Sequence, residues 1–126
     1  MYTDNMSYGS YLVCKEYLDE VSEFLKQFFS QIDSEYAHSE WITFIIPGTN
    51  FLINLMKGEG QESTKNVTFE IYFCSLVELK KFADTYKVEI CSFESTKAKT
   101  GYLYYYCEIL GPNNICKIEA SYTENL

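Results

Sequence analysis

The residue of this chain best placed to do chemistry is Glu119, a single acid in the stretch GPNNICKIEASY, residues 111–122. A carboxylate can ligate a metal, and a pair such as Glu108 and Glu119 can act as general acid and base. Histidine chemistry is limited, because His38 is the only histidine and cannot form a histidine metal cluster. No Gly-rich phosphate loop is present.

The composition limits the class of partner. The chain has 126 residues, a formal net charge of −8 and no arginine, so its basic residues are all lysines. Nucleic acids are usually bound through clustered arginine and lysine, so we expect no nucleic-acid partner. The charge, with 12 tyrosines and 9 phenylalanines, favours a neutral or cationic aromatic ligand, although an acidic solvated surface is the simpler explanation of the charge.

The cysteines and the hydropathy bear on location. The five cysteines form no Cys-x-x-Cys pair, and their number is odd. With no signal peptide at the N-terminus, reduced thiols and a cytoplasmic location are the expectation. No apolar run reaches the roughly 18 residues that a membrane helix needs, so we expect no membrane partner.

Hydrophobic periodicity predicts the elements that position these groups. Residues 16–31 carry apolar side chains at the i, i+3, i+4, i+7 spacing of an amphipathic helix. Ser75 and Glu78 form a capping box at the start of a second helix, over 76–86. The predicted strands cover 9–15, a short segment near 34–38, 41–48, 50–58, 67–73, 87–93, 101–110 and 115–122.

The order of these elements is repeated. A shift of about 58 residues superposes the first strand and helix on their second copies, with apolar residues meeting apolar residues. We therefore predict a single α+β domain over 1–126 with two tandem β-α-β-β-β modules, about 8–57 and 67–122, joined by a linker over 58–66. The two sheets are expected to form one curved, mixed half-barrel with the helices outside.

Each strand of such a sheet has one side facing the helices and one facing a concave cup. The helix-facing side is predicted to be apolar and to include Tyr11, Val13, Phe51, Ile53, Leu55, Phe69, Ile71, Phe73 and Ile118. The cup is predicted to hold Ser10, Leu12, Cys14, Leu52, Asn54, Thr68, Glu70, Tyr72, Tyr104, Tyr106, Glu108, Lys117, Glu119 and Ser121. Aromatic rings with a few polar groups are typical of a ligand-binding cavity. The predicted ligand contacts are Trp41, Asn54, Glu70, Tyr72, Tyr104, Tyr106, Glu108 and Glu119.

Two short stretches add to the pattern. Phe24-Leu25 stands in the first helix, where one family often has Phe-Tyr, and GPNNICKIE is similar to that family's Asp-Pro-x-Gly-Asn turn and following strand. Gly111 replaces the aspartate and Asn114 the glycine. Over about 9–122 the chain thus resembles the vicinal oxygen chelate superfamily, which includes glyoxalase I, bleomycin-resistance proteins, fosfomycin-resistance enzymes and extradiol dioxygenases.

This resemblance implies positions for a divalent metal, on the first and last strands of each module. In this chain the implied positions are Ser10, Asn54, Thr68 and Glu119. Only Glu119 is a strong ligand, since a hydroxyl binds zinc, iron or nickel poorly and one carboxylate cannot retain a transition metal. A Glu70–Glu119 pair with water is the best remaining metal site. We therefore expect no catalytic residues and no cofactor.

Three functions remain open from the sequence. The favoured one is a metal-free small-molecule binding protein, similar to bleomycin-resistance proteins, that holds a neutral or cationic aromatic ligand in an acidic, tyrosine-rich cup. One alternative is a metal-dependent lyase or dioxygenase of the same superfamily with a degenerate metal site. The other is a dimeric interaction module, because tyrosines occupy both faces of the strand over 101–110. A homodimer is expected.

Overall fold

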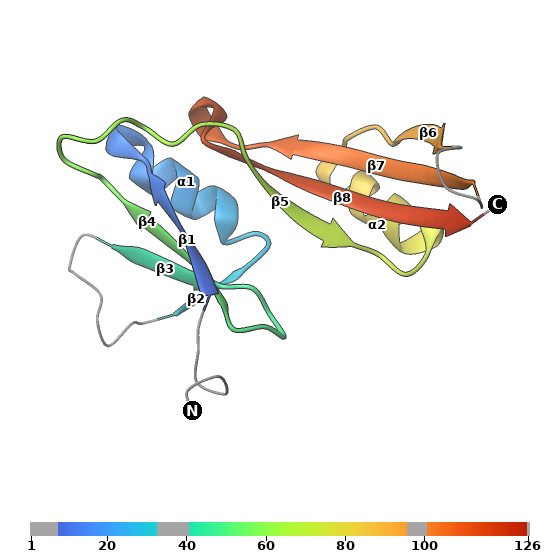
Figure 1. Ribbon diagram of the computed structural model, residues 1–126, viewed down its shortest axis with the longest axis horizontal. Helices are drawn as coiled ribbons and strands as arrows, with labels where there is room; N and C mark the ends of the chain where they lie inside the picture. The colour runs from blue at the N-terminus through green and yellow to red at the C-terminus, as the bar shows by residue number, and fades with distance from the viewer. Residues whose placement is uncertain (1–7, 33–40, 96–100, 126) are drawn as a thin grey trace. The chain divides into compact units, whose positions relative to one another are not determined.

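The computed structural model describes residues 8–32, 41–95 and 101–125 (Figure 1). Within these ranges the chain forms strands β1 to β8 and helices α1 and α2. His38 and the strand expected near 34–38 lie outside the described residues. No helix in the described part of the chain is long and apolar enough to cross a membrane.

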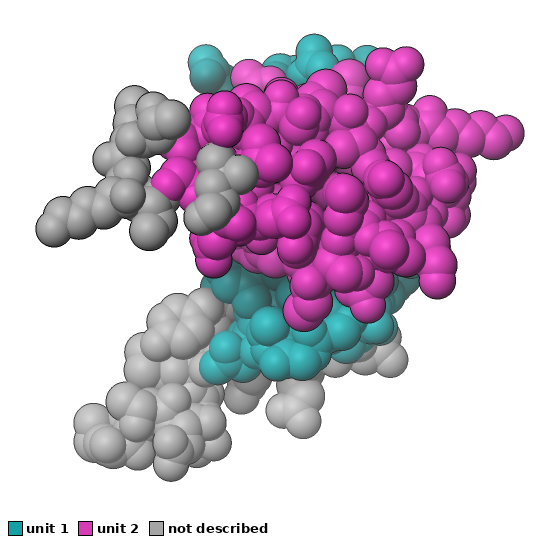
Figure 2. Space-filling view, turned by 90° about the vertical axis from the view of Figure 1, so that its right-hand side faces the viewer, with its two compact units in different colours: residues 1–65, 111–115 teal, residues 66–110, 116–126 magenta. Residues whose placement is uncertain are grey.

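The chain divides into two compact units, which Figure 2 colours separately. Unit 1 comprises residues 1–65 and 111–115, and unit 2 comprises residues 66–110 and 116–126. The first boundary falls at the end of the predicted linker. A short turn from the second half of the chain, residues 111–115, nevertheless belongs to unit 1. This turn contacts α1.

Unit 1 contains a four-stranded sheet with the strand order β1-β4-β3-β2. β1 runs parallel to β4, and the other neighbouring strands are antiparallel. The elements are β1 (Tyr8–Val13), the 3-10 helix η2 (Lys15–Tyr17), α1 (Leu18–Leu25), β2 (Ser30–Ile32), β3 (Ile42–Ile45) and β4 (Phe51–Met56). The 3-10 helix η3 (Pro112–Asn114) completes the unit.

Helix α1 is shorter than the helix predicted over 16–31. Leu18, Val21 and Leu25 are buried, as the amphipathic spacing requires. Beyond Leu25 the last turn tightens, because the N–H of Phe28 donates to the carbonyl of Leu25 three residues earlier. The chain then leaves the helix and enters β2.

Unit 2 contains the second four-stranded sheet, with the order β5-β8-β7-β6. β5 runs parallel to β8, and β8, β7 and β6 are antiparallel neighbours. The elements are β5 (Val67–Tyr72), α2 (Leu76–Tyr86), β6 (Cys91–Ser95), β7 (Tyr102–Leu110) and β8 (Cys116–Asn125).

The core of unit 2 lies between α2 and one face of this sheet. Leu79 and Ala83 of α2 pack with Cys107 of β7 and Ala120 of β8, all of them buried. The N-cap of the predicted capping box is confirmed at the start of the helix, where the Ser75 hydroxyl accepts a hydrogen bond from the backbone N–H of residue 78 at 3.2 Å. The cap and the buried apolar stripe together hold α2 on the sheet.

Both units follow the β-α-β-β-β plan, which confirms the predicted α+β fold with tandem modules. Equivalent hydrogen bonds align them, because the N–H of Cys14 donates to the carbonyl of Met56 and the N–H of Phe73 donates to the carbonyl of Ser121. Cys14 therefore matches Phe73, and Met56 matches Ser121. Residues that lie the same number of positions before these pairs correspond to each other in the two modules. We call this correspondence the module equivalence.

Strand β1 turns the opposite face to the core from the one predicted. Leu12 and Cys14 are fully buried, whereas Tyr11 is 60% exposed. The prediction that Tyr11 and Val13 face the helix is wrong, and so is the prediction that Ser10, Leu12 and Cys14 face the cup. The connection from β1 to α1 is one residue longer than the connection from β5 to α2. A single shift therefore cannot superpose both the strands and the helices.

Candidate functional site

Three carboxylates lie side by side on one face of the unit 2 sheet. In the strand register, Glu70 of β5 is opposite Glu119 of β8, and Glu119 is opposite Glu108 of β7. Cys107 and Ala120, their neighbours in sequence, point to the core beneath α2, so the row points away from the helix, as alternation predicts. Like charges directly opposite one another on neighbouring strands are unfavourable unless each finds a partner.

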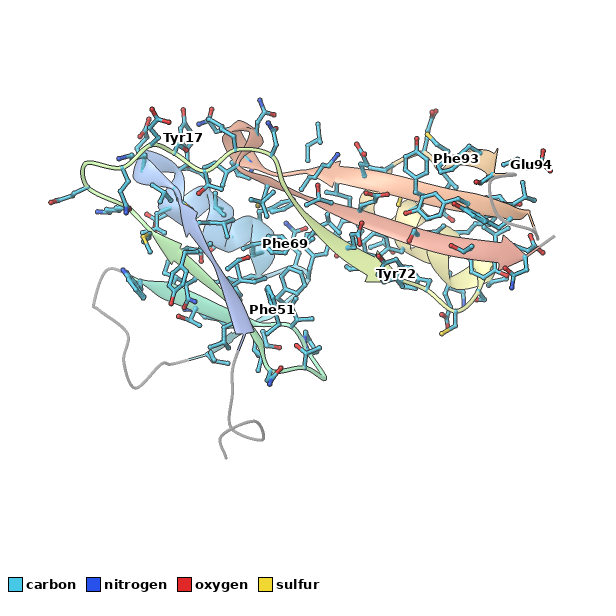
Figure 3. The ribbon with its side chains drawn as sticks, viewed as in Figure 1. Tyr17, Phe51, Phe69, Tyr72, Phe93 and Glu94 are labelled. Atoms are coloured by element: carbon cyan, nitrogen blue, oxygen red, sulfur yellow. The ribbon has the colours of Figure 1, made fainter. Side chains whose placement is uncertain are left out.

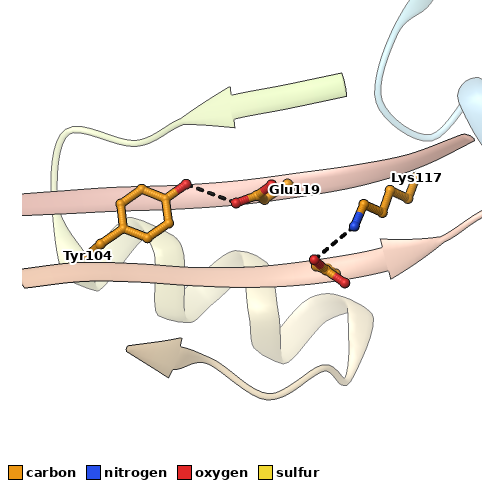
Figure 4. A network of polar contacts seen from close by, with 4 residues as sticks. Tyr104, Lys117 and Glu119 are labelled. Atoms are coloured by element: carbon orange, nitrogen blue, oxygen red, sulfur yellow. Dashed lines mark hydrogen bonds and ion pairs between the residues drawn. The ribbon is translucent and has the colours of Figure 1, made fainter. Parts of the chain in front are cut away.

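Each carboxylate of the row has such a partner. The Tyr104 hydroxyl donates to Glu119 Oε1 at 2.9 Å, and the Tyr72 hydroxyl donates to the Glu70 carboxylate. The Lys117 ammonium forms an ion pair with Glu108 at 2.9 Å (Figure 4). All three donors lie on the same face of the sheet as the carboxylates. Tyr72 is two residues from Glu70 on β5, whereas Tyr104 and Lys117 each lie on the strand next to that of their carboxylate.

The two tyrosines of this network have raised pKa values. For Tyr72 the main cause is its hydrogen bond to Glu70. For Tyr104 the main cause is desolvation by burial, and Ser121 lowers the pKa while Glu119 raises it further. Both hydroxyls therefore keep their protons at neutral pH. The face offers acceptors to a cation, but these two tyrosines supply no phenolate base.

Aromatic rings gather on the same face towards β6. The ring centroid of Phe93 lies 5.1 Å from that of Tyr104 and 6.1 Å from that of Tyr106, and Tyr104 stacks on Tyr106 at 5.6 Å. Phe93 is 48% exposed and Tyr72 is 69% exposed. Both residues are labelled in Figure 3. We call this surface of the unit 2 sheet the acidic face. Its residues are Glu70, Tyr72, Phe93, Tyr104, Tyr106, Glu108, Lys117 and Glu119.

Phe93 was absent from the predicted site. The register of β6 places it opposite Tyr104, and so brings it onto the acidic face. The sequence held a signal for this, because Ile90 packs on the core and alternation then turns Phe93 to the other face.

The tyrosines on the opposite face of β7 have a structural role. Tyr105 stacks with Tyr122, with ring centroids 6.2 Å apart, and both pack against the core cluster of unit 2. Rings occur on both faces of β7 because one face packs under α2 and the other belongs to the acidic face. The aromatic composition of this strand therefore does not require an interface on its inner side.

Two predicted site residues, Trp41 and Asn54, belong to unit 1 rather than unit 2. Asn54 is nearly buried, and its side-chain oxygen accepts a hydrogen bond from the Thr43 hydroxyl at 2.9 Å. Trp41 packs edge-on against Tyr11, with centroids 5.6 Å apart. The other six predicted ligand contacts all lie on the acidic face.

The Asn54 neighbourhood is the neutral counterpart of the carboxylate row. Tyr11, Asn54 and Thr43 lie opposite one another on β1, β4 and β3. The module equivalence matches these three positions with Glu70, Glu119 and Glu108, respectively. The negative charge of the candidate site is thus concentrated in unit 2.

Solved structures share this architecture over nearly the whole chain. A glyoxalase/bleomycin resistance protein/dioxygenase from Alicyclobacillus acidocaldarius aligns with a TM-score of 0.55 and 14% identity over 97% of this chain and 94% of that one. For a lactoylglutathione lyase from Agrobacterium tumefaciens these values are 0.57, 10%, 94% and 93%. For an antibiotic binding protein from a Streptomyces species they are 0.57, 7%, 94% and 95%. The chain has the vicinal oxygen chelate fold.

In sequence, the chain matches no protein-family model and no curated protein. The vicinal oxygen chelate fold carries both enzymes and binding proteins, as these neighbours illustrate. A fold shared by such different proteins does not decide between them, so the function must be argued from the residues of the site.

The first metal position implied by the vicinal oxygen chelate fold is lost in unit 1. By the module equivalence, the counterpart of Thr68 is Gly9, not the predicted Ser10. Ser10 shares the helix-facing side of the sheet with Ile53, its register partner. Glycine supplies no ligand, and a Cβ added at Gly9 would lie 2.8 Å from the carbonyl oxygen of Leu52. The backbone of β4 therefore leaves little room for any side chain there.

The remaining donors do not fit a transition metal. Thr68 offers only a hydroxyl, and Asn54 only an amide that is engaged within its own sheet. Glu119 is a strong ligand, but both it and Glu70 accept hydrogen bonds from tyrosines. Among the described residues, no group of three or more His, Cys, Asp and Glu side chains is placed to hold a metal ion.

The cysteines are divided between buried and accessible thiols. Cys14, Cys107 and Cys116 are buried, whereas Cys74 and Cys91 are exposed. Burial raises the pKa of Cys14 to about 11, and it also raises the pKa of Cys107. The thiolate is the reactive form of cysteine, so these two buried thiols are inert at neutral pH.

Proposed function

We propose that this protein is a metal-free small-molecule binding protein whose acidic face holds a neutral or cationic aromatic ligand. The observation that carries the proposal is the combination, on one exposed sheet face, of the Phe93, Tyr104 and Tyr106 rings with the row of three carboxylates. Rings bind planar ligands by stacking, and carboxylates beside them attract positive charge.

The exposure of the rings supports a ligand rather than a purely structural face. Phe93 leaves half of its surface in water, although it sits beside two other rings. A planar ligand laid against this group would remove apolar surface from water on both partners, at roughly 25 cal/mol for each Å². The ring system is held from behind by the packed core of unit 2, so it is ordered before the ligand arrives.

Binding without catalysis agrees with the chemistry of the face. The metal positions hold a glycine, a hydroxyl, an amide and one carboxylate, which do not select a transition metal. Tyr72 and Tyr104 stay protonated at neutral pH and already donate to carboxylates. The antibiotic binding protein among the structural neighbours shares this fold, and it supports the class of function without indicating the ligand.

The proposal is tested with 1-naphthylmethylamine, which is cationic at pH 7, and with the neutral 1-naphthylmethanol, by calorimetric titration of the full chain. We expect saturable binding of at least the amine. Phe93→Ser should weaken it by roughly 2- to 12-fold, the value of one aromatic contact. Val77→Ser is the matched control, because Val77 is an exposed apolar residue of α2 in the same unit.

Two outcomes would count against the proposal. One is the absence of saturation by either ligand at millimolar concentration. The other is equal affinity of the Phe93→Ser and Val77→Ser variants. Metal analysis after dialysis against zinc, nickel or manganese tests the alternative of a metal-dependent lyase or dioxygenase. That alternative requires close to one tightly held metal per chain, and less than about 0.1 would exclude it.

A dimeric interaction module is the second candidate, and one observation favours it. Tyr72 and Leu110 are each 69% exposed, and exposed apolar surface is often an interface. We also propose that the protein is a homodimer. Sedimentation of the wild type and of a Tyr104→Ser/Tyr106→Ser double variant decides whether these rings join two copies, since the variant would then sediment as a monomer.

A further inference from the structure

A hollow of about 420 Å³ opens at the β6–β7 side of unit 2, next to the acidic face. Its lining residues are Val88, Glu89, Cys91, Tyr106, Cys107 and Glu108. Glu89, Cys91 and Glu108 are exposed, so the hollow is open to solvent. Only Tyr106 and Glu108 of this set were predicted to contact a ligand.

Two carboxylates, Glu89 and Glu108, line the hollow together with the ring of Tyr106. Cys91, the first residue of β6, is opposite Tyr106 of β7, and Glu89 precedes Cys91 by two residues. Val88 and Ile90 both pack against the core of unit 2. Glu89 lies between them in sequence, so alternation turns its side chain away from the core and towards the hollow.

The charges in the hollow favour a cation. Lys117 of β8 pairs with Glu108, so the Glu108 carboxylate already binds an ammonium group of the protein, and Glu89 is the other carboxylate of the lining. Two ion pairs occur within the described ranges, and neither involves Glu89. A ligand cation placed between Glu89 and Tyr106 would be attracted by the Glu89 carboxylate, and it would also lie against the ring.

We propose that this hollow binds a methylated ammonium group. Val88 and the ring of Tyr106 present apolar and aromatic surface, which matches N-methyl groups and attracts the positive charge by a cation–π contact. A primary ammonium is more strongly hydrated and carries no methyl groups to lie against Val88 and the ring, so it gains less from this part of the lining. The inference rests on the proposed function, because Tyr106 and Glu108 belong to both sites, and it specifies the charged group of the ligand.

The test compares choline with its neutral isostere 3,3-dimethylbutan-1-ol and with ethanolamine, by NMR titration of the ¹⁵N-labelled full chain. Choline should bind with a Kd at least about fivefold lower than that of the isostere, which corresponds to about 1 kcal/mol for an exposed cation–π contact and ion pair. The largest amide shifts should fall on residues of the hollow. Choline binding no tighter than the isostere, or weaker than ethanolamine, would overturn the proposal.

Variants localise the effect. Glu89→Gln should raise the choline Kd by about threefold, the value of one exposed ionic contact, and leave the affinity for the isostere unchanged. Glu94→Gln is the matched control, because it removes the same charge from β6 at a position opposite Leu103, on the other face of the sheet. Equal effects of the two variants would show that choline is attracted only by the overall negative charge of the protein. That result would refute binding in the hollow.

The choline comparison uses no aromatic ligand, so its outcome separates the two proposals. If the naphthyl ligands fail to bind and choline binds, the hollow stands and the aromatic ligand is wrong. If the naphthyl ligands bind and choline behaves like its isostere, the proposed function stands and the hollow is refuted.

Discussion

The hydrogen bond between Tyr104 and Glu119 makes a prediction about stability at high pH. Tyr104→Phe removes the hydroxyl and keeps the ring, which remains 5.6 Å from Tyr106. Hydrogen bonds to charged groups contribute about 1.5–3 kcal/mol, but Glu119 is only partly buried and can bind water once the hydroxyl is gone. We therefore expect the variant to lose about 1 kcal/mol of unfolding free energy at pH 7.

The loss depends on pH in a defined direction. The pKa of Tyr104 in the folded protein is raised above its ordinary value near 10, which it keeps in the unfolded chain. Below pH 10 the hydroxyl is protonated in both states, so the contribution is present in full. As pH rises through the folded pKa the contribution is lost. The difference between wild type and variant should thus be constant from pH 7 to 9 and shrink above pH 10.

Urea denaturation at pH 7, 8, 9, 10 and 11 measures this difference by linear extrapolation. Tyr106→Phe is the matched control, since Tyr106 lies on the same strand and face and no hydrogen bond to its hydroxyl is seen in the described ranges. A difference that stays constant to pH 11 would refute the assignment of the raised pKa to Tyr104. A Tyr106→Phe variant with the same pH dependence would refute the specific pairing with Glu119.

Three further predictions test the fold. Leu12→Ala should cost about 2–5 kcal/mol of unfolding free energy and Tyr11→Ala less than about 1 kcal/mol, because only Leu12 is fully buried. Equal costs would contradict the observation that Leu12, and not Tyr11, faces the core. Ser75→Ala should cost about 1 kcal/mol through loss of the helix cap, measured by thermal unfolding, and no change would show that the cap is dispensable. A thiol reagent at pH 8 should label the two exposed cysteines of the native protein quickly and all five after denaturation; fast native labelling of Cys14, whose pKa burial raises to about 11, would contradict its placement.

The general plan of the fold could be predicted from sequence because the repeat is carried by hydrophobic periodicity. In unit 2 the alternation of VTFEIY and CKIEASY separates apolar from polar residues cleanly, so Glu70 and Glu119 fall on the face that the pattern assigns. The capping box of α2 is a local feature, formed by residues three apart, and needs no tertiary information.

The error in β1 has a physical origin. Its residues Tyr11, Leu12, Val13 and Cys14 are all apolar enough to face a core, so periodicity alone cannot choose a side. The choice depends on the length of the following connection, which includes a 3-10 helix that no strong sequence signal marks. A one-residue difference in that connection moves every side chain of the strand to the other face.

The site was predicted only where it depends on one strand at a time. Tyr104, Tyr106 and Glu108 follow from alternation along β7. The face of Phe93 also follows from alternation, but its place beside Tyr104 depends on how β6 pairs with β7. This pairing is long-range, and so is the arrangement that brings Glu89 and Tyr106 into one hollow, and neither has a local sequence signal. The choice of Ser10 as a ligand position shares the origin of the error in β1, because the longer connection makes Gly9 the counterpart of Thr68.

The turn over residues 111–115, which belongs to unit 1, limits how the chain can be divided into fragments. The backbone passes between the two units three times, after residues 65, 110 and 115, so no single cut yields two complete units. A fragment ending at residue 65 would lack Ile115, which is fully buried in the whole chain. Neither unit is therefore one continuous segment of the chain. Any continuous fragment that contains all of one unit also contains part of the other.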